Sequence, residues 1–132
     1  MLNGVIPASW SGHIHAALRV VTGLIFLQHP LTKFIHWPFT DYFPVGQALP
    51  PLMITAGVIE LIGSVLIILG LKTRLVAFIL AGEMAFAYFL GHSPYSFFPI
   101  QNGGEAAVLL CFIFLYFAAV GAGPYSVDES RK

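Results

Sequence analysis

Several side chains that can carry charge or protons lie inside stretches of sequence that are otherwise apolar. Arg19, His29 and Lys33 interrupt the first apolar run, Glu60 lies in the second and Glu83 in the third. A charge near the centre of a bilayer costs on the order of 2.5–3.5 kcal/mol on an insertion scale, so such groups pair, take up protons or hold a ligand. Carboxylates and a histidine at graded depths can deliver protons to a bound molecule. The pattern therefore predicts a buried polar site with proton chemistry.

The first apolar run carries its polar residues on one face. At about 100° per residue, a stripe about 80° wide contains Arg19, Thr22, Phe26, His29 and Lys33. Pro30 cannot donate to the carbonyl of Phe26, which leaves a free acceptor in the same stripe. We expect this stripe to face the protein interior as the wall of a cavity. The alternative is that Gln28, His29 and Lys33 extend to the outer lipid headgroups.

The two buried glutamates need partners. Glu60 and Glu83 each lie eight residues into an apolar run, and Arg19 is the only basic residue that we expect at the same depth. We therefore expect Arg19 to pair with Glu60, Glu83 or both, and an unpaired glutamate to take up a proton. Two carboxyl groups for one arginine favour a proton-binding or ligand-orienting cluster. The alternative is a structural ion pair that fixes the helix register.

Three more candidates lie later in the chain. Asn102 and Glu105 have the spacing of a capping box, while the functional alternative is that Glu105 joins His29, Lys33 and His92 in a polar mouth. Tyr116 shares a helical face with Glu105, so we expect its hydroxyl to point inward. No HxxxH or ExxH pair falls on one helical face, so no metal site is expected.

The composition is that of an integral membrane protein. Of its 132 residues, 58% are hydrophobic and only 9% charged, with a mean hydropathy of +0.84, which leaves too little polar surface to cover a soluble globule. The expected partner is therefore the lipid bilayer. Six basic and six acidic residues cancel, and nothing indicates nucleic-acid binding. The single cysteine excludes an intrachain disulfide.

Four apolar runs predict an all-α, four-helix membrane bundle that forms a single domain over residues 1–132. The expected helices are 14–35, 52–69, 75–90 and 106–122. Lys72 and Arg74 lie in the short second connection, and Arg131 and Lys132 lie at the C-terminus. The positive-inside rule then predicts that both termini are cytoplasmic and that the two longer, aromatic-rich connections form a lid at the outer side.

Five segments follow one another in an order and spacing that resemble the DoxX family of small four-helix membrane proteins. They are Arg19 with Gly23, Phe26, His29 and Lys33; Gly57, Glu60 and Gly63 leading to Gly70-Leu-Lys-Thr-Arg74; Met84 and Ala87 with His92; Asn102-Gly-Gly-Glu105; and Gly121 to Asp128. Pro30 is a departure, because the family commonly has glycine after the histidine of the first helix. The resemblance implies a multi-pass protein of the prokaryotic cytoplasmic (inner) membrane and a setting of respiratory or quinone redox chemistry.

The main functional hypothesis is a quinone-interacting accessory subunit of a membrane redox system. Quinone ring oxygens would meet His29, Lys33 or Glu105, and Glu60 or Glu83 would pass protons. The sequence has no haem-attachment, iron–sulfur or dinucleotide-binding motif, so no intrinsic cofactor is expected and electrons would come from a redox partner. The alternatives are a small-molecule binding or transport module that uses the glutamates as counter-ions, and a purely structural subunit. Self-association stays open.

Overall fold

The computed structural model describes residues 4–132, so the first three residues of the expected single domain lie outside the described part. Within that part every regular element is helical, as predicted. The long helices are α1 (Ser11–Ile35), α2 (Pro51–Leu69), α3 (Thr73–Ala87) and α5 (Glu105–Val120). The shorter elements are η1 (Ala8–Trp10), the π-helical η2 (Tyr88–His92), α4 (Pro99–Asn102) and α6 (Val127–Ser130).

Three helical stretches are long and apolar enough to cross a membrane. They are Ala8–Ile35, Pro51–Leu69 and Thr73–His92, while α5 is a shorter apolar helix of 16 residues. At 1.5 Å per residue α5 is about 24 Å long, somewhat less than a hydrocarbon core of about 30 Å. The expectation of a helical membrane bundle is therefore confirmed, with three to four spanning helices.

Proline and glycine residues set the ends of α2. Pro51 begins the helix, where a missing N–H costs no hydrogen bond. Gly70 ends it with a φ of 67°, the left-handed conformation that glycine adopts at low cost. Only residues 70–72 separate α2 from α3, so these two helices run antiparallel.

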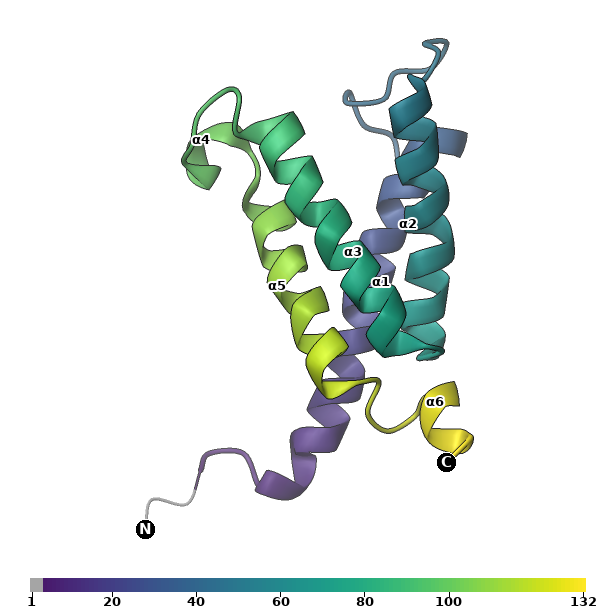
Figure 1. Ribbon diagram of the computed structural model, residues 1–132, viewed down its shortest axis with the longest axis vertical. Coiled ribbons are helices and arrows are strands. Elements are labelled where there is room, and N and C mark those ends of the chain that lie inside the picture. The colour runs from purple at the N-terminus through teal and green to yellow at the C-terminus, as the bar shows by residue number, and fades with distance from the viewer. Residues whose placement is uncertain (1–3) are drawn as a thin grey trace.

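Successive long helices alternate in direction (Figure 1). We call the end that carries residues 4–10, the C-terminus with α6, and the α2–α3 turn the terminal end. We call the opposite end, with the connection 36–50 and α4, the loop end.

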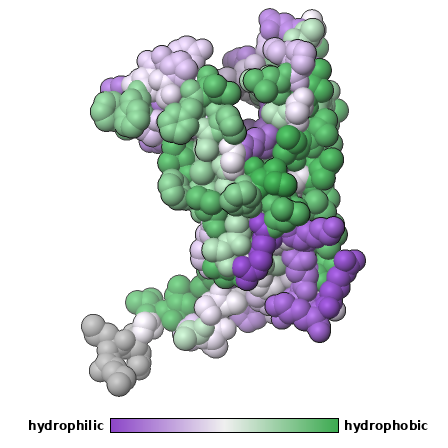
Figure 2. All heavy atoms as spheres, in the orientation of Figure 1, coloured by the Kyte–Doolittle hydropathy of each residue, from purple (hydrophilic) through white to green (hydrophobic). Residues whose placement is uncertain are grey.

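The bundle consists of two closely packed helix pairs. One pair is α1 with α2 and the other is α3 with α5; α2 contacts α3, and α1 meets α5 at few places. Phe26 packs edge-on against Phe114 with ring centroids 5.0 Å apart, and Ile67, Leu80 and Phe117 complete the fully buried centre. The pairs diverge toward the loop end (Figure 1), and the space-filling view shows a notch between them there, with hydrophilic atoms at its base (Figure 2).

Candidate functional site

A buried ion pair joins α1 to α2. The ammonium of Lys33 donates to Oε2 of Glu60, and each side chain is only 5% exposed. The helices approach closely here because Gly57, one turn before Glu60, has no side chain: a Cβ at Gly57 would lie 2.6 Å from Cζ of Phe34 and 3.4 Å from Cδ of Lys33. Lys33 therefore faces the protein interior, as the stripe on α1 predicts, and does not extend to the headgroups.

The carboxyl group of Glu83 lies at the same level of the bundle. A Cβ at Gly63 would meet the side chain of Leu80, so these two positions face each other across α2 and α3. One turn toward the loop end from this contact are Glu60 on α2 and Glu83 on α3. Both carboxyl oxygens of Glu83 are buried and have no hydrogen-bond partner within residues 4–132. The charges of Glu60 and Lys33 both act on this carboxyl.

His29 lies beside the ion pair, one turn before Lys33 on α1. Its side chain is half-buried, its ring centroid is 5.6 Å from that of Phe26, and it is within electrostatic reach of both Lys33 and Glu60. His29 also lines a pocket of about 230 Å³ at the loop end. We call this the mouth pocket; its walls are Gln28, His29, Thr32, Pro38, Phe39, Thr40, Tyr42 and Phe43.

The predicted pairing of Arg19 with Glu60 or Glu83 is wrong. The Arg19 guanidinium is fully buried and donates instead to backbone carbonyls: Nε to Ala122 at 2.9 Å, Nη1 to Ile67 and Ile68 at 2.9 and 2.6 Å, and Nη2 to Tyr125 at 2.8 Å. Arg19 precedes Lys33 by 14 residues, or about 21 Å along the helix, so it reaches the last turn of α2 at the terminal end. There it satisfies carbonyls that have no partner at a helix C-terminus.

Of the remaining three candidates, His92 and Tyr116 have partners elsewhere in the structure and Glu105 is exposed. Nδ1 of His92 lies 3.0 Å from the carbonyl oxygen of Asn102, and Glu105 is exposed on the first turn of α5. The capping box does not form, because Oδ1 of Asn102 accepts from the amide of Gly104 at 2.7 Å. The hydroxyl of Tyr116 lies 3.1 Å from Nδ1 of His15 near the terminal end, so it does not point toward the glutamates.

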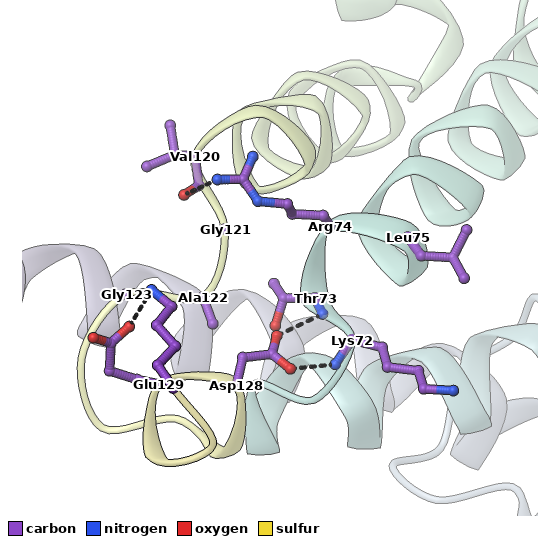
Figure 3. Close-up of a pocket in the computed structure, with 11 residues that line it drawn as sticks. Lys72, Thr73, Arg74, Leu75, Val120, Gly121, Ala122, Gly123, Asp128 and Glu129 are labelled. Carbon is purple, nitrogen blue, oxygen red and sulfur yellow. Dashed lines mark hydrogen bonds and ion pairs between the residues drawn. The ribbon is translucent and has the colours of Figure 1, made fainter.

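A second polar region, which was not predicted from the sequence, lies at the terminal end. Oδ1 and Oδ2 of Asp128 accept from the amides of Lys72 and Thr73 at 2.7 and 2.9 Å, and Arg74 donates to the carbonyl of Val120 at 3.1 Å (Figure 3). Burial alone would raise the pKa of Asp128, but the backbone amides of Thr73 and Lys72, together with the Thr73 side chain and the charge of Arg131, outweigh it and lower that pKa overall. These groups line an open pocket of about 540 Å³.

These contacts connect the start of α3 to the C-terminal segment through Asp128, and to the end of α5 through Arg74. Nothing in the spacing of Asp128 signals this role, because its partners precede it by more than 50 residues.

Comparison with known proteins agrees with this architecture. The DoxX family model matches residues 14–93, more than half of the chain, and the matched part contains His29, Lys33, Glu60 and Glu83. The chain belongs to the DoxX family. An uncharacterized Haemophilus influenzae protein is 47% identical over 117 residues, which cover 86% of this chain and 87% of the relative.

A second relative, from Bacillus subtilis, carries the provisional name oxidoreductase CatD. It is 45% identical over 65 residues, which cover 48% of each chain. No solved structure matches this DoxX-family protein.

Proposed function

We propose that this DoxX-family membrane protein is an accessory subunit of a membrane redox system and binds a quinone at the cluster of Lys33, Glu60 and Glu83. One observation carries the proposal: the Glu83 carboxyl is buried and has no hydrogen-bond partner among residues 4–132, at the level of a buried ion pair. A bare carboxylate in that position is costly, so the group favours either a proton or a ligand that hydrogen-bonds to it. The provisional name of the Bacillus relative supports the redox setting.

The residues of the cluster fit a quinone headgroup chemically. Quinone ring oxygens accept hydrogen bonds, and both the Lys33 ammonium and a protonated Glu83 are donors. When bound, a quinone supplies two-electron, two-proton redox chemistry, and the electrons would come from a separate redox protein. The contribution of this chain is to orient the ring, to exclude water and to hold a proton at the Glu83 carboxyl.

We further propose that the terminal end faces the cytoplasm of a prokaryote. Lys72, Arg74, Arg131 and Lys132 all belong to that end, which is the distribution that the positive-inside rule favours. The mouth pocket would then open on the outer side of the inner membrane.

A second candidate function is the binding or transport of a small hydrophobic cation. It is favoured by the same unpartnered carboxyl, because the ion pair already uses the charge of Glu60 and leaves Glu83 available as a counter-ion. The two functions predict different copurifying molecules.

The test is to purify the protein in mild detergent and to identify bound molecules by mass spectrometry and ultraviolet difference spectra. We expect about one quinone per chain in the wild type and at least about a tenfold loss in Glu83→Leu, the equivalent of one good buried hydrogen bond. Glu105→Leu is the matched control, since Glu105 is exposed at the start of α5, and it should retain the quinone.

Each other result points to a different function. A lipophilic amine lost from Glu83→Leu would replace the quinone proposal with the counter-ion function. No reproducible ligand, with variants that differ only in stability, would leave a structural subunit.

A further inference from the structure

His29 lies between the mouth pocket and the buried ion pair. His29 lines the mouth pocket, together with Gln28 and Thr32 from α1 and five residues between Pro38 and Phe43. It is also close enough to Lys33 and Glu60 for their charges to act on it. At about 30 Å³ per water, a pocket of 230 Å³ has room for several water molecules, and Gln28 and Thr40 offer polar groups to hold them.

The ion pair itself is covered on the side of the loop end. The ammonium of Lys33 lies 5.6 Å from the centroid of the Phe43 ring, and Nδ1 of His36 lies 3.0 Å from the carbonyl oxygen of Phe43. Lys33 and Glu60 are each only 5% exposed. A proton that reaches this cluster from the loop end therefore needs a carrier between the pocket and the cluster, and His29, which lines the pocket one helical turn before Lys33, has that position.

We propose that His29 carries protons from the mouth pocket to the cluster of Lys33, Glu60 and Glu83. The imidazole accepts a proton at one ring nitrogen and releases the proton of the other toward the carboxyl groups, and no electron moves in this step. This inference rests on the proposed function, because quinone reduction consumes two protons at a site that is buried from water. It assigns His29 to proton supply and leaves contact with the quinone ring to Lys33 and Glu83.

The test measures how fast the carboxyl proton of Glu83 exchanges with solvent. The full chain is reconstituted in lipid nanodiscs and transferred to heavy water, and the carbonyl stretch of the protonated carboxyl is followed by infrared spectroscopy. The band is assigned to Glu83 by its absence from the spectrum of the Glu83→Gln variant. We expect His29→Phe to slow the exchange at least about tenfold, in line with the loss of a positioned acid–base group.

Two further variants separate proton transfer from a packing effect. His29→Gly should be equally slow, and added imidazole should restore its exchange rate, because imidazole supplies the missing ring without restoring the fold around it. His92→Phe is the matched control. His92 is also at the loop end, but its Nδ1 contacts the carbonyl of Asn102, so the Glu83 proton of this variant should exchange as fast as that of the wild type.

The proposal is overturned by equal exchange rates in wild type and His29→Phe, by absence of imidazole rescue, or by absence of a Glu83-dependent band. Quinone copurification with each variant is measured in parallel. Equal exchange with the quinone retained would refute the proton-carrier role of His29 alone. If no quinone copurifies with the wild type, the proposed function is refuted, whatever the exchange rates show.

Discussion

The buried pair of Lys33 and Glu60 predicts a large and specific coupling in stability. Replacing Lys33 by Met leaves the Glu60 carboxylate in an apolar site without its partner, and replacing Glu60 by Met strands the ammonium in the same way. Both side chains are 5% exposed, so water does little to compensate for either loss. Breaking a buried pair costs about 3–5 kcal/mol, and we expect each single variant to lose about 3 kcal/mol of unfolding free energy.

The double variant Lys33→Met/Glu60→Met removes both charges and keeps apolar side chains of similar length. We expect its stability to lie within about 1 kcal/mol of the wild type, which gives a coupling energy of about 5 kcal/mol. The assay is reversible unfolding in mixed micelles with increasing dodecyl sulfate, followed by circular dichroism. The matched control is Lys132→Met, which removes the exposed pair with Glu129, where the side chains are 73% and 52% exposed. We expect this control to lose less than about 1 kcal/mol.

Two results would refute the argument. If the losses of the single variants simply add in the double variant, Lys33 and Glu60 do not interact in the folded protein. If Lys132→Met costs as much as Lys33→Met, the loss reflects the charge removed and not its burial.

Three further predictions concern the packing and the terminal end. Arg19→Lys should cost about 2–4 kcal/mol in the same assay, because lysine cannot reproduce the guanidinium bonds to four or more carbonyls, whereas Arg131→Lys on the exposed C-terminus should be neutral. Asp128→Asn should cost about 1 kcal/mol at pH 7, the loss of a helix cap, measured by unfolding from pH 3 to pH 7. Gly63→Val should cost more than about 1 kcal/mol, because its side chain would meet α3, while Gly82→Val points into open space and should not.

The sign of the pH dependence follows from the lowered pKa of Asp128. Its carboxylate stabilises the fold above the unfolded pKa of about 4, and this contribution is lost as the pH falls through the lower folded pKa. A wild type and an Asp128→Asn variant that lose stability in parallel below pH 4 would contradict this assignment. The Arg19 prediction is contradicted if Arg131→Lys loses as much unfolding free energy as Arg19→Lys. The Gly63 prediction is contradicted if Gly82→Val loses as much as Gly63→Val.

Much of the architecture can be predicted from the sequence because it depends on local properties. The apolar runs, the prolines at residues 50 and 51 and the glycine at residue 70 set where α2 begins and ends. The 3.6-residue period likewise places His29 and Lys33 on the interior face of α1. The π-helical winding of η2 was not predicted, since a hydrophobic run does not specify how its last turn is wound.

The partners of the charged residues could not be predicted from the sequence. Helical periodicity fixes the direction in which a side chain points, but it does not fix how far one helix slides along another. The connection 36–50 between α1 and α2 is long enough to permit several offsets, and the one that joins Lys33 to Glu60 also has the close contacts of Gly57 with α1 and of Gly23 with α2.

The sequence alone determined that this chain is a helical membrane protein with charged groups on interior faces, because composition and periodicity act within single helices. The tertiary structure decided that Lys33 pairs with Glu60, that Arg19 joins α1 to the end of α2 and to the C-terminal segment, and that Glu83 has no hydrogen-bond partner in the described part of the chain. Those outcomes depend on the axial offsets between helices, which are set by contacts between residues far apart in the chain.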